Sequence, residues 1–204
     1  MITVYHASMT RSVRVLWLLE ELGLPYEVVT LDFMAGDLQK PAYLAKNPLG
    51  RVPALEDGDV LVYESGAIVE WLCERYDTAH LLAPAPGTAA RARFLQWVHW
   101  SEATAMPPVS DFFQHSMIRP EAARIPQVVA DAVVKVAQWL AVLERHLLGK
   151  DFVLGSDFSA ADVMLGYTVG GARFTGQLDE RFPNVAAYLG RLMGRPAYQK
   201  ANAR

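Results

Sequence analysis

Residues 2–31, ITVYHASMTRSVRVLWLLEELGLPYEVVTL, contain the pattern that decides the fold of the first part of this chain. Ile2–His6 and Tyr26–Leu31 are β-prone runs, and Ser12–Leu22 between them has apolar residues at helical spacing. Gly23 predicts the end of this helix. A strand, a helix and a second strand predict a βαβ unit, whose strands are parallel and joined by a right-handed crossover.

A second set of elements completes a small α/β domain. Pro41–Lys46 is a predicted short helix, and Val52–Leu55 and Val60–Tyr63 are predicted strands on either side of Asp57-Gly58, a strong hairpin signal. Ser65–Tyr76 then has the apolar spacing of a helix with one buried face. The complete order, βαβ and then αββα, predicts a thioredoxin-like α/β fold, in which helices cover a four-stranded mixed sheet.

The remainder of the chain has only helical patterns. Residues 79–87 carry two prolines and a glycine, so we predict a linker between a domain over 1–78 and an all-α domain over 88–204. In the second domain we predict a helix from Thr88 to Thr104 that Pro107-Pro108 breaks or kinks. The predicted helices that follow are Gln127–Leu148, one that begins at the capping-box sequence Ser159-Ala160-Ala161-Asp162, and a final one over Pro183–Met193.

Composition argues against several classes of function. Apolar residues make up 52% and charged residues 20%, which favours a packed core, and a net charge of −3 without basic clusters argues against nucleic acid binding. The N-terminus lacks the layout of a signal peptide, and no uninterrupted apolar run reaches the roughly 18 residues of a membrane span. The histidines have no metal-ligand spacing. Cys73 is the single cysteine, so no disulfide can form within the chain, which suits the cytoplasm.

Five segments of the chain resemble one enzyme family. They are Ser8–Glu27 (SMTRSVRVLWLLEELGLPYE), Asn47–Leu55 (NPLGRVPAL), Tyr63–Tyr76 (YESGAIVEWLCERY), Ser159–Val163 (SAADV) and Phe182–Ala201 (FPNVAAYLGRLMGRPAYQKA). Together they resemble the cytosolic glutathione S-transferases, in particular the bacterial and fungal branch whose first helix starts with a Ser-Arg-Ser motif. The resemblance implies a homodimer that takes glutathione as co-substrate, and the apolar composition agrees with a buried subunit interface.

The resemblance implies two binding elements for glutathione. If the bond between Val52 and Pro53 is cis, as in the family, the Val52 N–H and C=O can pair antiparallel with the peptide of glutathione. Glu64 and Ser65 begin a predicted helix, whose exposed N–H groups would bind the γ-glutamyl carboxylate while Glu64 meets the ammonium group. Ser65 can also simply cap that helix.

Two cations in neighbouring loops are further candidates for binding. Arg51 and Lys40 could reach the carboxylates of glutathione, because each carries a long, positively charged side chain near the predicted site. The alternative is that both side chains are only solvated, as long cations in loops often are.

A hydroxyl at the start of the first helix would lower the pKa of the glutathione thiol. A two-unit decrease requires about 2.7 kcal/mol, and one hydrogen bond to a charged group supplies about 1.5–3 kcal/mol. Thr10-Arg11-Ser12 aligns with the Ser-Arg-Ser motif, so the resemblance implies Thr10 as the catalytic hydroxyl, with Ser12 as the second candidate. Thr10 could instead be the N-cap of the helix.

Other alignments leave the identity of this hydroxyl open. In the plant phi-type enzymes the catalytic residue can be located by its distance from the glycine that ends the first helix. Counting back that distance from Gly23 without gaps gives Met9, which cannot donate a hydrogen bond. The same count for the tyrosine-type enzymes gives Tyr5, and Ser8 is a further candidate. Cys73 lies in a later helix, unlike the cysteine of the omega and beta types, which argues against a mixed disulfide with a protein thiol.

The second substrate is expected in an apolar pocket between the two domains. The candidate lining residues are Trp97, Trp100, Met106, Phe112 and Phe113. The predicted function is therefore conjugation of the glutathione thiolate to a small hydrophobic electrophile. The alternatives are a glutathione-dependent peroxidase or disulfide reductase that uses the same site, and a non-catalytic binding protein with the same fold.

Overall fold

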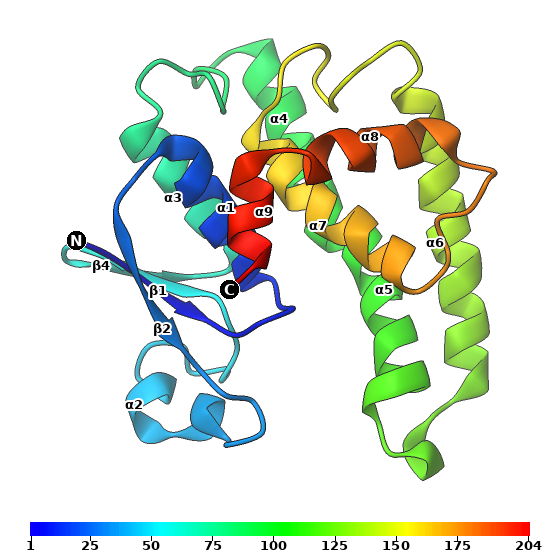
Figure 1. Ribbon diagram of the computed structural model, residues 1–204, viewed down its shortest axis with the longest axis horizontal. Helices are drawn as coiled ribbons and strands as arrows, with labels where there is room; N and C mark the ends of the chain where they lie inside the picture. Colours follow the sequence, from blue (N-terminus) through cyan, green and yellow to red (C-terminus); the bar gives the residue numbers. More distant parts are fainter. The chain divides into compact units, whose positions relative to one another are not determined.

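The N-terminal segment forms the predicted βαβ unit. In the computed structural model, which describes residues 1–204, β1 (Ile2–His6) pairs in parallel with β2 (Tyr26–Thr30), and α1 (Ser12–Leu22) connects them (Figure 1). Gly23 ends α1 in the left-handed conformation, with φ 64°, which glycine adopts at little steric cost. The first two turns of α1 are buried throughout.

A hairpin completes the sheet. β3 (Ala54–Asp57) pairs antiparallel with β4 (Val60–Tyr63), and Asp57 lies opposite Val60, so that Gly58-Asp59 forms the turn. β3 is also antiparallel to β1, which gives the strand order β2-β1-β3-β4. This mixed four-stranded sheet confirms the predicted thioredoxin-like fold.

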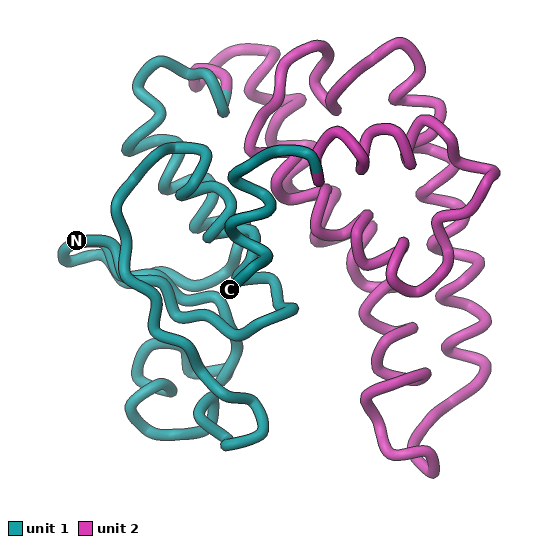
Figure 2. Tube along the Cα trace, in the orientation of Figure 1, with its two compact units in different colours: residues 1–83, 194–204 teal, residues 84–193 magenta.

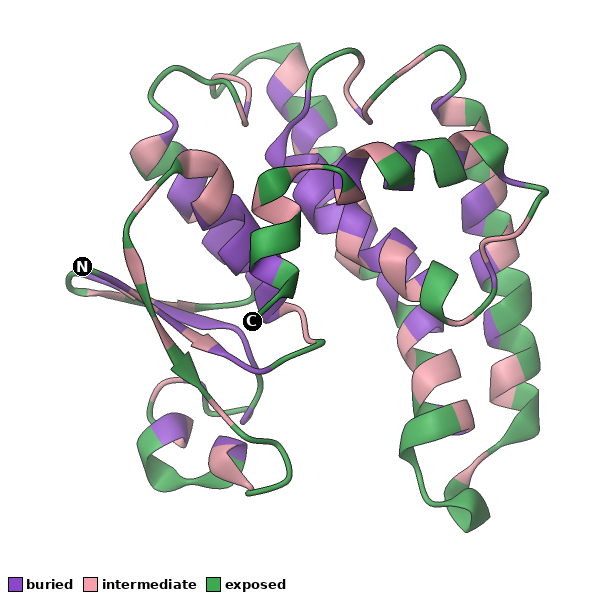
Figure 3. Cartoon of the chain, in the orientation of Figure 1, coloured by how far each residue is buried: buried purple, intermediate pink, exposed green.

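Helices cover both faces of this sheet. α3 (Ser65–Tyr76) packs beside α1 on one face, whereas the 3₁₀ helix η1 (Asp37–Gln39) and α2 (Pro41–Leu44) lie on the other (Figure 1). The larger core lies under α1 and α3, where Leu16 and Leu72 are completely buried (Figure 3). This core fixes the two helix N-termini relative to the end of β1.

The last helix packs with the N-terminal elements. The chain divides into one compact unit of residues 1–83 and 194–204 and another of residues 84–193 (Figure 2). α9 (Pro196–Asn202) lies against α1, and Tyr198 meets Trp17 edge-on with 4.9 Å between ring centroids. The sequence pattern indicated no helix beyond Met193, and the whole C-terminus was expected in the helical domain. The structure adds α9, and residues 194–204 lie in the same compact unit as α1.

Part of the predicted linker also belongs to the first unit. The carboxylate of Asp77 accepts hydrogen bonds from the backbone N–H groups of Leu81, Leu82 and Ala83, at 2.9, 2.7 and 2.8 Å. Ala83 is buried. The boundary between the units therefore lies after residue 83 rather than at residue 78.

Replacing Arg195 by methionine is expected to loosen α9. The Arg195 guanidinium donates to both carboxylate oxygens of Glu21, at 2.6 and 2.7 Å, and the Glu21 side chain is only 9% exposed. Because a bidentate, partly buried pair is stronger than an exposed one, we expect its loss to cost about 1–2 kcal/mol of local stability. Hydrogen exchange of the α9 amides would measure this opening free energy.

Lys200→Met is the matched control for that experiment. Lys200 also joins α9 to α1, through Glu20 at 2.7 Å, but its side chain is 62% exposed. An exposed single ion pair contributes about 0–1 kcal/mol. Equal effects of the two substitutions would contradict the view that the Arg195 pair anchors the helix.

The second unit is entirely helical, as predicted. Its helices are α4 (Ala89–Trp100), α5 (Met106–Phe113), α6 (Pro126–His146), α7 (Ala160–Phe174) and α8 (Pro183–Met193). The shorter helical turns are η2 (Ser101–Ala105), η3 (Gln114–Ile118) and η4 (Glu121–Ala123). The capping box predicted at the start of α7 is present, with reciprocal hydrogen bonds between Ser159 and Asp162.

The two consecutive prolines do not end the first helix of this unit. The π-helical turn η2 continues α4, and α5 begins directly after it at Met106. Pro107 and Pro108 are the second and third residues of α5 and directly follow the π-helical turn, whose altered hydrogen-bond pattern accommodates residues that lack an N–H. Of the break or kink expected at these prolines, the break is absent, because the helix continues through a π-helical turn before them.

α6 is the one helix that is long and apolar enough to cross a membrane by length and composition alone. Its buried residues include Val136, Leu140 and Leu143, whose spacing of three and four residues is typical of a helix packed in a bundle. Length and composition are weak criteria for such a helix, because a core helix meets them equally well.

Candidate functional site

The loop between β1 and α1 holds two hydroxyl groups in contact. Thr10 is half-buried, and its hydroxyl donates to the carbonyl of Ala7 at 2.6 Å. The Ser12 hydroxyl lies 2.6 Å from that of Thr10, and Ser12 is completely buried. Met9, between Ser8 and Thr10, has a positive φ of 62°, an unfavourable value for a residue with a side chain. Such strained residues cluster at functional sites.

Thr10 is not the N-cap of α1. That position is Arg11, which makes no side-chain capping bond. The one backbone N–H that contacts the Thr10 hydroxyl is that of Ser12, at a long 3.4 Å. Of the two leading candidates, Thr10 is partly exposed, whereas Ser12 is completely buried. A ligand thiol could therefore approach the Thr10 hydroxyl, whereas Ser12 lies behind it.

The hydroxyls of Tyr5 and Ser8, the other two candidates, donate hydrogen bonds to other groups of the protein. Tyr5 donates to the carboxylate of Glu56 at 2.9 Å, and burial, followed by this contact, raises the pKa of Tyr5. Lys46 also pairs with Glu56 and completes a small network on that side of the sheet. Ser8 is exposed, and its hydroxyl donates to the Arg204 carbonyl at 2.8 Å. Neither arrangement leaves a donor directed at a thiol beside Thr10.

Tyr5→Phe is expected to leave the acidity of bound glutathione unchanged. The substitution removes only the hydroxyl that donates to Glu56. The expected cost is a loss of about 1 kcal/mol of stability, as for one hydrogen bond. Titration of bound glutathione by thiolate absorbance would measure the first effect, and urea unfolding the second. A clear increase in the thiol pKa would instead assign the activating hydroxyl to Tyr5.

The N-terminus of α3 carries the second predicted element. Glu64 is exposed and occupies the N-cap position with φ 74° and ψ 114°, without a capping bond from its side chain. Ser65 is the first residue of the helix, so the cap predicted for it is absent. Instead its buried hydroxyl accepts a hydrogen bond from Nη1 of Arg14 at 3.0 Å. The first N–H groups of α3 have no intrahelical acceptors, which favours an anion at this end.

The peptide bond between Val52 and Pro53 is cis, as the resemblance implied. β3 begins after it, at Ala54 rather than at Val52, because Pro53 has no N–H to donate to the ladder. Val52 takes part in none of the backbone hydrogen bonds of the turns and loops. Its N–H and C=O are thus the groups that a bound peptide could pair with.

The two candidate cations are both exposed. The Arg51 carbonyl accepts hydrogen bonds from the Tyr43 hydroxyl at 2.5 Å and the Asn47 amide at 2.7 Å, which fixes the backbone before Val52 but not the Arg51 side chain. Lys40 pairs with Asp37 at 2.6 Å. That pair would have to open before the Lys40 ammonium could bind a ligand.

Three of the predicted elements meet at the end of β1. Ala7, which accepts the Thr10 hydrogen bond, packs in the same buried cluster as Val52. Arg14 of α1 connects the Thr10 loop to Ser65 at the start of α3. The site therefore combines a hydroxyl, a backbone edge and a helix N-terminus, with a buried guanidinium beneath them.

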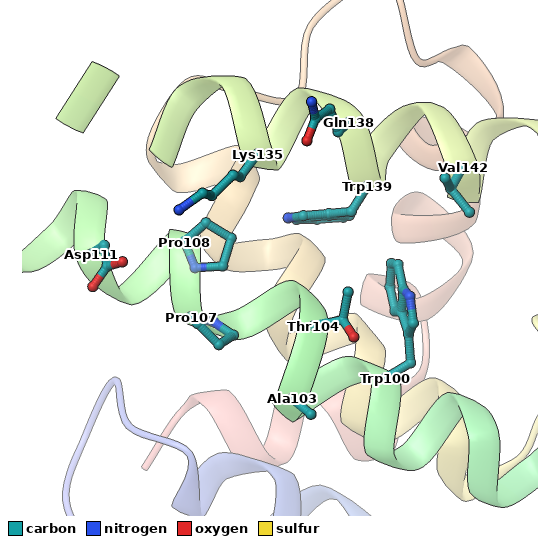
Figure 4. Close-up of a pocket in the computed structure, with 10 residues that line it drawn as sticks. All are labelled: Trp100, Ala103, Thr104, Pro107, Pro108, Asp111, Lys135, Gln138, Trp139 and Val142. Carbon is teal, nitrogen blue, oxygen red and sulfur yellow. The ribbon is translucent and has the colours of Figure 1, made fainter. Parts of the chain in front are cut away.

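The helical unit contains a separate cavity of about 420 Å³ (Figure 4). Trp100 and Trp139 form its aromatic side, where their rings meet edge-on at 5.9 Å, and Pro107 and Pro108 face them from α5 (Figure 4). Lys135 and other polar side chains lie at its rim. The cavity is large enough for a small organic molecule.

Of the five predicted pocket residues, only Trp100 lines this cavity. Trp97 and Met106 are 5% exposed and belong to the core of the unit. Phe113 is half-buried and stacks on Phe174 with 5.6 Å between ring centroids, and Phe112 is half-buried as well. The expected pocket between the domains stays a prediction.

The single cysteine lies in α3 and not in the loop between β1 and α1. Cys73 is buried within α3, as expected for an inert thiol. No group of three histidine, cysteine, aspartate or glutamate side chains is arranged to hold a metal ion.

Two residues of the site were missed by the sequence analysis. Arg14 is completely buried in α1, and His6 is 1% exposed at the end of β1. Each stands at a position where the local apolar pattern predicts a buried side chain, because His6 shares a strand face with Ile2 and Val4, and Arg14 lies one helical turn before Trp17 and Leu18. A buried polar residue at a core position needs a partner, and this signal could have identified both.

Comparison with known proteins agrees with the fold. Residues 1–74 match the glutathione S-transferase N-terminal domain, and residues 126–191 match the C-terminal domain of the same family. The chain is 33% identical to the probable glutathione S-transferase GSTF2 of Oryza sativa subsp. japonica, over 95% of this chain and 90% of the relative. It is 32% identical to glutathione S-transferase 3 of Zea mays, over 94% of this chain and 88% of that protein.

Solved structures give the same result. The glutathione transferase URE2P6 from Phanerochaete chrysosporium, in complex with oxidized glutathione, is 32% identical and superimposes with a TM-score of 0.89, covering 98% of this chain and 94% of that one. A glutathione S-transferase from Actinobacillus pleuropneumoniae is 29% identical, with a TM-score of 0.81 over 100% of this chain and 92% of that one. The relatives come from plants, fungi and bacteria, so they do not single out one branch. The chain belongs to the glutathione S-transferase superfamily.

Proposed function

We propose that this protein is a glutathione transferase in which the Thr10 hydroxyl stabilises the glutathione thiolate. The observation that carries the proposal is the meeting of three elements at the end of β1: the Thr10 hydroxyl, the unpaired backbone of Val52 and the N-terminus of α3. In the proposed complex Val52 pairs with the peptide of glutathione. The α3 N-terminus binds the γ-glutamyl carboxylate, and Glu64 binds its ammonium group.

The proposed reaction is attack of the thiolate on an electrophilic carbon. The thiol proton is released to solvent, a sulfur–carbon bond forms, and a leaving group such as halide departs with its electron pair. The protein contributes position and a lowered thiol pKa, because the nucleophile belongs to the bound co-substrate. For Arg51 and Lys40 we propose only peripheral contacts with the carboxylates of glutathione.

The electrophile would be small and hydrophobic, as in a detoxification enzyme. The aromatic cavity beside Trp100 supports this substrate class, because flat apolar molecules pack well against indole rings. We further propose a cytoplasmic homodimer, since the single cysteine is buried and the chain is rich in apolar residues.

Binding and turnover can be tested separately. Calorimetric titration with glutathione tests the site, and 1-chloro-2,4-dinitrobenzene, cumene hydroperoxide and bis(2-hydroxyethyl) disulfide test three reactions on it. Turnover of the aryl halide supports the transferase. Turnover of only the peroxide or the disulfide would assign the alternative reaction, and absence of glutathione binding would make the protein a non-catalytic member of the family.

A further inference from the structure

A buried chain of hydrogen bonds runs from His6 to Thr10. Nδ1 of His6 lies 2.8 Å from the Ser12 hydroxyl oxygen, which lies 2.6 Å from that of Thr10. The Thr10 hydroxyl in turn donates to the Ala7 carbonyl at 2.6 Å. His6 and Ser12 are both almost completely inaccessible to solvent.

The number of available protons determines which group donates in each of these hydrogen bonds. Ser12 also accepts a hydrogen bond from the Ala7 N–H at 3.3 Å. The Ala7 carbonyl lies 3.2 Å from the Ser12 hydroxyl and only 2.6 Å from that of Thr10, so the single Thr10 proton satisfies it at the shorter distance. The Ser12 proton is then available for the Thr10 oxygen, and the remaining Ser12 lone pair faces Nδ1 of His6. All three links are satisfied only when Nδ1 of His6 carries a proton and donates it.

The opposite direction makes one hydrogen bond fewer. If Ser12 donated to Nδ1, the Thr10 proton would turn inward to Ser12, and the Ala7 carbonyl would lose its short hydrogen bond. The His6 proton would then sit on Nε2, which is buried without a partner. A buried N–H without an acceptor costs free energy comparable to that of a lost hydrogen bond.

His6 is held in its neutral form by its surroundings. Burial, the largest effect, lowers the pKa of His6, and the positive charge of Arg204 lowers it further. The main-chain carbonyl of Arg204 opposes these effects by raising the pKa, although Nε2 of His6 makes no hydrogen bond in this structure. A neutral imidazole has one N–H. Whether Nδ1 or Nε2 carries that proton therefore decides the direction of the hydrogen bonds from His6 through Ser12 to Thr10.

We propose that His6 is a positioning residue, whose Nδ1–H directs the Ser12 proton to Thr10 and so keeps the Thr10 proton available for the glutathione sulfur. The inference rests on the proposed function, because it assigns a purpose to the Thr10 hydroxyl. On binding, the thiolate replaces the Ala7 carbonyl as acceptor, while the bonds from His6 and Ser12 stay in place. Polarisation along such a chain also strengthens its last bond.

Two variants of His6 test this role. In His6→Asn the side-chain amide can occupy the place of the Nδ1–H and donate to Ser12, whereas His6→Leu has a similar size and no donor. We expect His6→Leu to lower the thiolate fraction of bound glutathione roughly three- to tenfold at a pH below the thiol pKa. His6→Asn is expected to stay close to the wild-type protein. Affinity for S-methylglutathione, which has no ionisable thiol, monitors the integrity of the site in each variant.

The possible results are distinct. An unchanged thiol pKa in His6→Leu, together with an increased one in Thr10→Val, would overturn the role of His6 and leave the proposed function intact. An equal loss in His6→Asn and His6→Leu would also overturn it, by showing that packing and not the donor matters. If wild-type protein bound glutathione without acidifying its thiol, or did not bind it, the proposed function itself would fail.

The ring of His6 can also be observed without any ligand. Nitrogen-15 NMR distinguishes the two neutral tautomers of a histidine. We expect the proton on Nδ1. A proton on Nε2, directed toward the Arg204 carbonyl, would overturn the inference whatever the activity of the enzyme.

Discussion

Asp162→Ala is expected to lower the free energy of unfolding of the helical unit by about 3–5 kcal/mol. Asp162 is completely buried, and its carboxylate accepts four hydrogen bonds. The donors are the Val153 N–H at 2.9 Å, the Ser159 N–H and hydroxyl at 2.8 Å each, and the Tyr188 hydroxyl at 2.9 Å. One side chain thus joins the start of α7, the preceding loop and α8.

The expected loss of stability follows from the hydrogen-bond donors that alanine would leave without an acceptor. The two hydroxyls can rotate toward other acceptors, but the two backbone N–H groups cannot, and each unsatisfied buried donor costs about 1–3 kcal/mol. Burial raises the pKa of Asp162, and the four accepted hydrogen bonds oppose that effect. The same burial raises the pKa of Tyr188 well above its usual value, which keeps its hydroxyl a donor.

Ser159→Ala provides the matched control for Asp162. It removes the hydroxyl half of the capping box but leaves the Ser159 N–H bound to Asp162, so the expected cost is only about 1 kcal/mol. Urea unfolding followed by tryptophan fluorescence would measure both variants, with glutathione affinity as a check on the first unit. A loss below about 1 kcal/mol for Asp162→Ala would show that water or rearrangement satisfies the donors.

Local patterns were sufficient to predict most of the first unit. The βαβ order, the Gly23 helix end and the hairpin at Gly58 each depend on neighbouring residues, and all three are present. The packing of α9 on α1 could not be predicted in this way, because the Trp17–Tyr198 contact joins opposite ends of the chain. Long-range contacts of this kind leave no periodic signal in either segment.

The predicted break or kink at Pro107-Pro108 illustrates a different limit. Proline is unfavourable inside an α-helix, but a π-helical turn before it changes which N–H groups need acceptors. The choice between a break and a π-helical turn depends on packing, since Val109 just after the prolines is completely buried. A sequence rule based on backbone chemistry alone does not take that packing into account.

For the site, the sequence could indicate residue types but not hydrogen-bond partners. The sequence ranked Thr10 first and Ser12 second but left Tyr5 and Ser8 open as hydroxyl donors, and the partners of these side chains in the fold distinguish them further. Ser65 was predicted to cap α3 or bind a ligand, yet it accepts a hydrogen bond from Arg14. That guanidinium holds Ser65 in place and adds positive charge below the helix N-terminus, a role that no motif in the sequence suggests.

Thr10→Val is expected to raise the pKa of bound glutathione by about one to two units and to lower kcat/KM about 10- to 100-fold below that pKa. Valine has nearly the shape of threonine but no hydroxyl, so the substitution removes the donor and little else. A hydrogen bond to a charged sulfur contributes about 1.5–3 kcal/mol, and each pKa unit corresponds to about 1.4 kcal/mol.

The sign of the pH dependence follows from the ionised form of the thiol. Because the Thr10 hydroxyl stabilises the thiolate, its removal should shift the activity profile of the variant to higher pH and leave the rate at high pH less affected. Thr10→Ser, which retains the donor, should restore the wild-type profile, and affinity for S-methylglutathione should stay nearly constant in both variants. If Thr10→Val left the thiol pKa unchanged while Ser12→Ala raised it, the donor would be Ser12. That result would require the buried Ser12 side chain, which is completely inaccessible in this structure, to reach the ligand by a movement of the loop between β1 and α1.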